Sequence, residues 1–515
     1  MSAAPSPAGA PGGAVTSSSP ARRRRILLVT PDRLGARMAG PAIRAVNMAS
    51  LLGREHDVRI ATWHDSAYPS DLFDVVSTPI DGDQHAMREQ VDWADVLVLQ
   101  GLALNLFGSI HATDKIVVCD LYDPFHLEQL EQAKEQPVPA WRHSVHSATE
   151  ALNQQLHRGD FFLCANNRQR DFWLGQLAAM GRLNPDNYLA DETLSRLIAL
   201  VPFGTAEHPP TQSRHAIKGT VPGIGPDDKV LIWAGGVYNW FDPQTLVRAT
   251  GKVAASHPDV RLFFLGMKHP NPDVPAMRAA AEAVALADTL GLRDRVVFFN
   301  QTWVDYDERQ DYLLDADAGV TTHFEHIETR FSFRTRVLDY LWAGLPIITT
   351  RGDDFAELAD RDGLGISVAE RDADALAAAI ERVLYENGVA AEMGARVAAI
   401  RSEFTWERVL APLVEFCRDP RPAPDRLAQI WEDAPLGTPV AMSAAVTRLT
   451  LRRVVGAALR RARRLAGRVK RSLAARPSPA FEPPADIHAG TGGPADIHAG
   501  TGGPARSEDP DSRPD

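Results

Sequence analysis

Short runs of apolar residues alternate with longer segments of mixed polarity along most of this chain. The runs are continuous rather than alternating with polar residues, which is typical of parallel strands buried on both faces. The intervening segments have apolar residues at helical spacing. We therefore predict an α/β fold with two parallel sheets covered by helices. The predicted strands are at 26–30, 58–62, 96–99, 116–119, 161–164, 197–201, 230–234, 261–265, 296–299, 319–322 and 346–350.

The strands form two series, and these divide the chain into domains. Residues 205–227 separate the series, are rich in Pro, Gly, Thr and Ser, and are interpreted as a linker. The prediction is two Rossmann-like domains facing a cleft, at 24–204 and 228–404. Closing helices are predicted at 405–437. A ligand is expected in the cleft, at the carboxyl ends of the strands.

The two ends of the chain have a different composition. Residues 1–23 are mostly Ala, Pro, Ser and Gly before a short arginine run, and we predict a disordered lead. Residues 444–476 contain eleven Arg or Lys, no Asp or Glu, and apolar residues at steps of three or four. This pattern predicts a basic amphipathic helix. Residues 477–515 are rich in Pro and Gly, with a ten-residue duplication, and predict a disordered tail.

Charge is distributed unevenly along the chain. The whole sequence has a net charge of −11, while 444–476 contributes +11, so the remainder carries −22. We expect the basic helix to bind an anionic membrane surface. The alternative is a solvated or nucleic-acid-binding arm, although no nucleic-acid partner is expected for the acidic body.

Cysteine content and hydropathy bear on the location of the protein. The three cysteines show no metal-ligand spacing and are interpreted as buried thiols, which favours a reducing interior. No run of eighteen apolar residues is present. We predict a cytoplasmic protein, peripheral on the inner face of the membrane.

Two glycine-containing loops are candidate ligand sites. Gly40 precedes a helix predicted from about residue 42, and the loop with Gly40 and Arg44 is expected to face the cleft. Gly235 and Gly236 follow the first strand of the second series, where paired glycines allow backbone amides to approach a pyrophosphate. An ordinary strand-to-helix turn is the alternative for the first loop. Asp242 is interpreted as a helix cap.

The segment 325–350 is the most informative part of the sequence. Ser332 is predicted to cap a helix that ends at Gly344, before the strand at 346–350. Arg336 and Asp339 lie three positions apart on one face of this helix. A cation for phosphate and a carboxylate for a ribose diol would form a nucleotide grip. A surface ion pair is the alternative interpretation.

These residues resemble a known family. The stretch 336–346, with an acid followed by small or apolar residues and then Gly-Leu-Pro, is similar to the signature helix of GT-B glycosyltransferases of family 4. The loop at 39–40, the glycine turn at 235–236, Val-Pro-Phe-Gly at 201–204 and Trp-Val at 303–304 are also similar. The resemblance extends over about residues 24–417.

The resemblance implies a function and a set of site residues. It implies retaining transfer of a sugar from a nucleotide-diphosphate donor, without metal or other cofactor. The basic helix at 444–476, placed on an anionic membrane, favours a lipid-linked or cell-surface glycan as the acceptor. The first domain would bind the acceptor, with Gly40 and Arg44 on the acceptor-side loop. Implied donor-binding residues are Gly235, Gly236, Trp303, Val304, Arg334, Arg336 and Asp339. Implied catalytic residues are Glu328, His126 and Asp120.

The sequence also departs from the family pattern, and two alternatives follow. Phe331 stands where the family has its first acid, with Glu328 the nearest replacement, and positions 238–241 lack the usual cations. Arg334 and Arg336 are expected to replace these cations. Asp120 and Asp123 are alternatives to His126 at the end of the strand at 116–119. A structural role is the other interpretation of His126, and a turn role before Pro124 is the other interpretation of Asp123. The alternative functions are a sugar-nucleotide epimerase on the same fold and a catalytically silent protein that binds a glycan or a partner.

Overall fold

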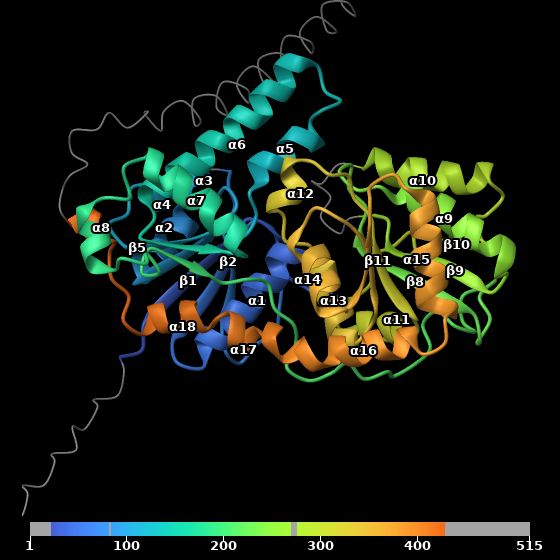
Figure 1. Cartoon of the computed structure of the whole chain (residues 1–515). Coiled ribbons are helices and arrows are strands. Elements are labelled where there is room, and N and C mark those ends of the chain that lie inside the picture. The colour runs from blue at the N-terminus through green and yellow to red at the C-terminus, as the bar shows by residue number, and fades with distance from the viewer. Residues whose placement is uncertain (1–21, 82–83, 269–275, 428–515) are drawn as a thin grey trace, which may run out of the picture. The chain divides into compact units, whose positions relative to one another are not determined.

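The computed structural model describes residues 22–81, 84–268 and 276–427, and Figure 1 shows their helices and strands. The predicted basic helix at 444–476 and the predicted tail at 477–515 lie outside the described residues. So does the predicted lead, except for its last two residues.

The first half contains a seven-stranded parallel sheet with the order β3-β2-β1-β4-β5-β6-β7. Its central strands are buried along almost their whole length, as expected for a sheet covered on both faces. The strands are β1 (Arg25–Thr30), β2 (Asp57–Thr62), β3 (Asp74–Ser77), β4 (Val96–Gln100), β5 (Ile116–Asp120), β6 (Phe161–Cys164) and β7 (Ile198–Leu200).

Helices connect these strands, and two of them, α7 and α8, begin with an asparagine side-chain cap. Asn166 accepts a hydrogen bond from the backbone N–H of Gln169 and so starts the helix after β6. The helices of this half are α1 (Gly40–Gly53), α2 (His85–Trp93), α3 (Ala103–Leu106), α4 (Gly108–His111), α5 (Phe125–Gln132), α6 (Val138–Arg158), α7 (Asn167–Ala179) and α8 (Pro185–Ala190).

The second half contains a six-stranded parallel sheet with the order β10-β9-β8-β11-β12-β13. Close packing shapes its centre, because a Cβ on Gly319 of β11 would lie 2.2 Å from the ring of Tyr340. The strands are β8 (Lys229–Gly236), β9 (Val260–Gly266), β10 (Val297–Phe299), β11 (Ala318–Thr321), β12 (Ile347–Thr350) and β13 (Gly365–Val368).

The helices of the second half place their N-termini at the carboxyl ends of the strands they follow. Asp242 accepts a hydrogen bond from the N–H of Thr245 and caps the helix after β8, as predicted. The elements are α9 (Pro243–Ser256), α10 (Arg278–Thr289), η1 (Tyr306–Glu308), α11 (Arg309–Leu314), α12 (Ile327–Phe331), α13 (Thr335–Ala343), α14 (Asp354–Asp362), α15 (Ala373–Tyr385), α16 (Val389–Ile400) and η2 (Arg401–Phe404).

The last described helices return to the first half, as the orange helices in Figure 1 show. They are α17 (Trp406–Val409), α18 (Ala411–Arg418) and α19 (Pro424–Leu427). Trp406 packs on Phe203, with 4.7 Å between ring centroids, and Phe416 stacks on Phe161 at 4.3 Å. Gly204 permits this approach, because a Cβ there would lie 2.8 Å from the indole of Trp406.

The predicted α/β fold with two Rossmann-like sheets is confirmed, and some local predictions need correction. Strands β3 and β13 were not predicted. Ser332 follows the end of α12 and donates to the carbonyl of Thr329, so it does not cap α13. Gly344 does end α13, in the left-handed conformation. Arg44 lies inside α1 rather than in the preceding loop.

Burial and hydropathy agree with two further expectations. All three cysteines are buried and unbridged, and burial raises the pKa of each thiol to about 12. None of the helices in the described ranges combines the length and apolar character needed to cross a bilayer.

Candidate functional site

The glycine turn at the end of β8 holds a buried arginine. Gly235 has φ of +102°, and no atom lies within 4 Å of the place where its Cβ would be. Arg336, at the start of α13, donates from Nη2 to the carbonyl of Gly236 at 2.7 Å. Its guanidinium lies over the rings of Trp233 and Phe241, at 4.6 and 4.3 Å from their centroids. These contacts place a cation directly beside the glycine turn.

The Arg336 side chain has unused hydrogen-bonding capacity. The residue is only 8% exposed, and Nη1 has no hydrogen-bond partner among the described residues. Burial lowers the pKa of the guanidinium to about 10, which still leaves it charged at neutral pH. Because a buried donor without a partner is destabilising, Nη1 marks a place for an acceptor supplied by a ligand.

Arg334 differs from Arg336 because it already has an anionic partner. Its Nη1 and Nη2 donate to the two carboxylate oxygens of Glu328, at 2.9 and 2.7 Å, and both residues are buried. The carboxylate of Asp353 lies 3.9 Å from Nε. Burial raises the pKa of Asp353 to about 6, against the opposing effect of Arg334. Glu328, predicted to contact a sugar, is therefore also the counter-charge of Arg334.

Asp339 is half-buried in α13 and pairs with an arginine that the sequence analysis did not single out. Arg309 Nε donates to Asp339 at 3.1 Å. The same guanidinium lies over the rings of Tyr306 and Trp342, at 3.7 and 4.5 Å. The predicted alternative of a surface ion pair between Arg336 and Asp339 is therefore wrong: Arg336 is buried, and the partner of Asp339 is Arg309, thirty positions away.

Trp303 joins the two halves of the molecule. Its indole N–H donates to the carbonyl of Met38, in the loop after β1, at 3.2 Å. In the same region Arg37 forms an ion pair with Asp305 at 2.9 Å. Val304, next to Trp303, packs against the large hydrophobic core that includes residues of both sheets. The loop after β1 and the segment with the predicted donor-binding residues Trp303 and Val304 are therefore in contact.

Gly40 is the first residue of α1, two positions earlier than the predicted start of that helix. A Cβ on it would lie 4.0 Å from the Phe203 ring and from the hydroxyl of Tyr122, so space alone does not demand a glycine here.

Asp120 and Arg44 form a closed ion pair in the first half. Arg44 donates from Nε and Nη2 to the two carboxylate oxygens of Asp120, both at 2.8 Å. It also donates to the carbonyls of Val201 and Pro202, and Gln100 donates to Asp120 at 3.0 Å. Both charged side chains are fully buried. We therefore revise the predicted catalytic and acceptor-side roles of these two residues and interpret them as a structural pair.

His126 lies in α5 against two aromatic rings. Its ring is stacked with Phe172, at 5.5 Å between centroids, and tilted against Trp173 at 5.9 Å. Nδ1 is buried and has no partner in the described part of the chain. Burial lowers the pKa of His126 to about 4, so the imidazole is neutral at physiological pH. The ring is suited to donating or accepting a hydrogen bond rather than to pairing with a charge.

Phe331 occupies the place of the missing family acid and packs across to the first half. Its ring lies 4.7 Å from that of Phe172, which in turn contacts His126. Gln169 donates from its side-chain amide to the carbonyls of both Tyr122 and Phe331, at 2.8 Å each. Phe331 and Gln169 thus hold α12 against the first half.

Two more carboxyl groups lie near this contact: Asp123, which the sequence offered as an alternative to His126, and Glu128, which was not predicted as a site residue. Burial, together with the charge of Glu328, raises the pKa of Asp123 to about 7. Burial and the charge of Asp123 also raise the pKa of Glu128 well above its usual value. Glu128 lies on an amphipathic helix, where an acid usually faces solvent, so the sequence offered no signal for it. No group of three or more metal-ligating side chains is assembled within the described ranges.

Comparison with known proteins identifies the second half. The family model "Glycosyl transferases group 1" matches residues 228–386. This segment is a group 1 glycosyltransferase domain. It contains the glycine turn at 235–236, Arg336 and Asp339, so the predicted resemblance is confirmed.

One curated relative of the glycosyltransferase domain is the D-inositol 3-phosphate glycosyltransferase of Actinosynnema mirum. It is 27% identical over 193 residues, which are 37% of this chain and 44% of that protein. The match thus spans less than half of the relative.

Solved structures extend the comparison to both halves. The sucrose-phosphate synthase of Thermosynechococcus elongatus has 15% identity and a TM-score of 0.56, over 77% of this chain and 98% of that chain. The Anabaena protein HepE, solved with UDP-glucose, has 13% identity and a TM-score of 0.56, over 76% of this chain and 99% of that chain. At these identities the likeness concerns the fold, and it shows that the glycosyltransferase domain is part of a GT-B architecture.

Proposed function

We propose that the protein transfers a sugar from a nucleotide-diphosphate donor to a hydroxyl acceptor. The observation that supports this most is Arg336, a buried cation with an unpartnered Nη1 beside the open glycine turn. A buried charge is stable only with a counter-charge, and the diphosphate of a sugar nucleotide would supply one. The group 1 glycosyltransferase match over the same residues supports the same chemistry.

The donor would contact the second half along the carboxyl ends of its strands. The backbone N–H groups near Gly235 and Gly236 would approach the diphosphate, with Arg336 as counter-charge. Asp339 would bind the ribose, and Trp303 and Val304 would lie near the base. Glu328 and His126 would contact the transferred sugar, the first through hydroxyl groups and the second as a neutral ring. UDP-sugars are the first donors to test, because HepE was solved with UDP-glucose.

Catalysis would rest on positioning and on electrostatic relief of the leaving diphosphate. We propose retention of configuration and no metal, since Arg336 can neutralise charge that develops on the phosphate oxygens. For the acceptor we propose a lipid-linked or cell-surface glycan. The basic segment at 444–476 supports this proposal, because it would hold the enzyme at an anionic membrane.

The decisive experiment measures release of nucleoside diphosphate from a panel of sugar nucleotides, with and without membrane extract. We expect release that depends on the extract, and loss of release in Arg336→Ala. The matched control is Arg382→Ala, an exposed arginine in α15. Equal release in both variants would overturn the assignment of Arg336 to the donor. Release or epimerised sugar without acceptor would instead support an epimerase or hydrolase.

A second candidate is a catalytically silent protein that binds a sugar nucleotide. It is favoured by Phe331, which packs on Phe172 at the position of the family acid. For this candidate we expect calorimetry to show UDP binding, and we expect no turnover of any sugar nucleotide with any extract. Turnover in the same preparation would exclude it.

The membrane proposal has its own test. We expect the full chain to float with vesicles that contain anionic lipid, and a chain ending at Gly437 to remain in the soluble fraction. Neutral vesicles are the control for charge. Equal flotation of the two chains would show that 444–476 is not the membrane-binding segment.

A further inference from the structure

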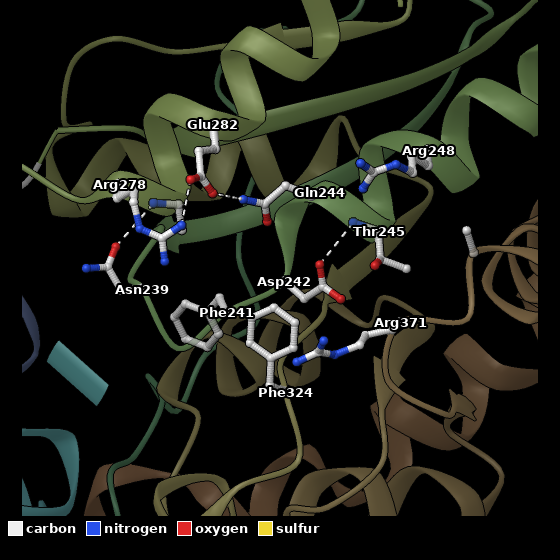
Figure 2. Close-up of a pocket in the computed structure, with 12 residues that line it drawn as sticks. Asn239, Phe241, Asp242, Gln244, Thr245, Arg248, Arg278, Glu282, Phe324 and Arg371 are labelled. Carbon is white, nitrogen blue, oxygen red and sulfur yellow. Dashed lines mark hydrogen bonds and ion pairs between the residues drawn. The ribbon is translucent and has the colours of Figure 1, made fainter. Parts of the chain in front are cut away.

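A cavity lies in the glycosyltransferase half, apart from the residues assigned to the donor. Its volume is about 500 Å³, and Figure 2 shows its lining side chains. They come from the loops after β8 and β11 and from the N-terminal ends of α9, α10 and α15. None of the proposed donor-binding or catalytic residues lines it.

Three helices of twelve to fourteen residues begin at this cavity. Helix N-termini carry partial positive charge. All three are partly satisfied by side chains. Asp242 Oδ1 accepts from the N–H of Thr245 at 3.0 Å, Asn239 accepts from the N–H of Ala279 at 3.2 Å, and Asp372 Oδ1 accepts from the N–H of Ala375 at 2.8 Å, which leaves the other first-turn N–H groups. The backbone therefore contributes a positive field to the cavity.

Arginines add to this field, and two of them, Arg248 and Arg371, have no carboxylate partner among the lining residues. Glu282 is already engaged by Arg278, at 2.5 Å, and by Gln244, at 2.9 Å. Arg248 is exposed and has no hydrogen bond or ion pair within the described residues. Arg371 is exposed and lies 4.7 Å from the ring centroid of Phe324, while its ion-pair partner Glu370 lies outside the cavity lining. Arg248 and Arg371 are therefore available to an anionic group.

The buried carboxylate of Asp242 has one oxygen that requires a hydrogen-bond donor. Asp242 is only 2% exposed, and Oδ2 has no hydrogen-bond partner in the described part of the chain. In Figure 2 this second oxygen points away from Thr245, toward the side where Arg371 and Phe324 lie. A ligand that satisfies Oδ2 must donate a hydrogen bond, which a bare phosphate ion does not do well but a sugar hydroxyl does.

Aromatic rings complete the lining. Phe241 and Phe324 both line the cavity, and such faces suit the apolar C–H surface of a pyranose ring. Phe241 also contacts the guanidinium of Arg336 at 4.3 Å. One side chain is thus shared by this cavity and the donor region.

We propose that this cavity binds an anionic saccharide, with a sugar hydroxyl on Asp242, its carboxylate or phosphate on Arg248 and Arg371, and its ring against Phe324. The lining calls for a ligand with a hydroxyl donor, an anionic group and an apolar face. An anionic saccharide has all three. This is a binding site in addition to the donor site, and it does not depend on sugar transfer.

Calorimetry on the full chain can test the proposal with four defined probes: glucose 6-phosphate, glucuronate, glucose and inorganic phosphate. Saturating UDP is present throughout to occupy the donor region. We expect glucose 6-phosphate or glucuronate to bind at least tenfold more tightly than glucose or phosphate. Phosphate binding as tightly as glucose 6-phosphate would overturn the saccharide assignment, and so would the absence of binding by both anionic sugars.

Variants then locate the bound probe. Arg248→Gln combined with Arg371→Gln is expected to weaken binding of the anionic sugar at least tenfold. The matched control combines Arg382→Gln with Arg396→Gln, two exposed arginines of α15 and α16. Equal affinity in the two double variants would place the probe elsewhere and overturn the proposal.

Phe324→Ala separates sugar recognition from anion recognition. We expect it to weaken binding of glucose 6-phosphate several-fold and to leave phosphate binding unchanged. An equal loss for both probes would contradict contact between the sugar ring and Phe324. Because all readouts are binding constants, they stand whether or not the chain proves to be a transferase.

Discussion

Two buried arginines, one in each half, have opposite hydrogen-bonding states. Arg44 is fully buried and donates to both oxygens of Asp120 and to the carbonyls of Val201 and Pro202. Arg336 is nearly as buried, yet it has one backbone acceptor, two aromatic faces and an unpartnered Nη1. Both were candidate site residues in the sequence, and burial alone does not separate them.

The difference lies in what compensates the charge. The guanidinium of Arg44 is neutralised by a carboxylate of the same chain, so its interactions stabilise the folded protein. Arg336 has no carboxylate partner among the described residues, and its Nη1 has no hydrogen-bond partner there. A buried charge that is fully paired is structural, whereas one that is incompletely paired is the better marker of a binding site.

The largest expected effect comes from breaking the paired arginine. Arg44→Ala should lower the free energy of unfolding by about 3–5 kcal/mol, because it leaves Asp120 buried without its counter-charge. Urea unfolding followed by circular dichroism measures this. Arg44→Met with Asp120→Leu should recover part of the loss, since both charges are then removed. A loss below about 1 kcal/mol in Arg44→Ala would remove the contrast with Arg336.

Arg336→Ala should affect binding more than stability. Loss of charge-assisted hydrogen bonds to a diphosphate costs about 1.5–3 kcal/mol, which corresponds to about 10- to 100-fold weaker UDP binding. Calorimetry against UDP measures this, with Arg382→Ala as the exposed control. The same variant should unfold at a urea concentration close to that of the unmodified protein. A large loss of stability with unchanged UDP affinity would reverse the interpretation.

Two carboxyl groups of the first half, Asp120 and Asp123, show the same contrast between a paired and an unfavourably placed charge. Asp120 has Arg44, whereas the pKa of Asp123 is raised to about 7 by burial and the nearby charge of Glu328. Since the folded pKa lies above the unfolded value near 3.9, its contribution to stability is fully present below about pH 4 and is lost as the pH rises through 7.

Asp123→Asn should therefore stabilise the protein at pH 8, by about 1–3 kcal/mol, and have little effect at pH 4. Unfolding curves at four pH values between 4 and 8 measure this difference. A matched substitution, Asp294→Asn on an exposed turn, should show no such trend. Destabilisation by Asp123→Asn at pH 8 would contradict the prediction, because it would mean that the ionised carboxylate of Asp123 makes a favourable interaction in the folded protein.

The smallest expected effect concerns Asp339. Asp339→Asn should weaken UDP binding by about 0.5–1.5 kcal/mol, or about 2- to 10-fold, through loss of a hydrogen bond to the ribose. It should also reduce the preference for UDP over 2′-deoxy-UDP, whereas Arg309→Gln should leave that preference unchanged. Equal preference in Asp339→Asn and the unmodified protein would confine Asp339 to its ion pair with Arg309.

Most of the fold could be predicted because short, continuous apolar runs identify strands buried on both faces. Strand β3 was missed because it is short and lies at the sheet edge, so two of its residues are exposed. Strand β13 is also a four-residue edge strand. Exposure explains β3 but not β13, which is mostly buried; there Gly365 and Ser367 alternate with Ile366 and Val368, so no continuous apolar run is present.

The site was predicted where its residues are close in sequence. Arg334, Arg336 and Asp339 lie within six positions of one another in the sequence. The paired glycines at 235–236 are also recognisable locally. The partners of these residues were not predictable in the same way. Arg309 pairs with Asp339 across thirty positions, and Arg44 pairs with Asp120 across seventy-six.

The sequence by itself determined the two sheets, the positions of the glycine turns and the set of chemical groups available near the donor region. Apolar periodicity and turn preferences act over a few residues, so they can be read along the chain. Only the tertiary structure decided which arginine is neutralised and which is not. That distinction depends on which carboxylates and carbonyls approach each guanidinium in space, and the packing of distant strands and helices sets those distances.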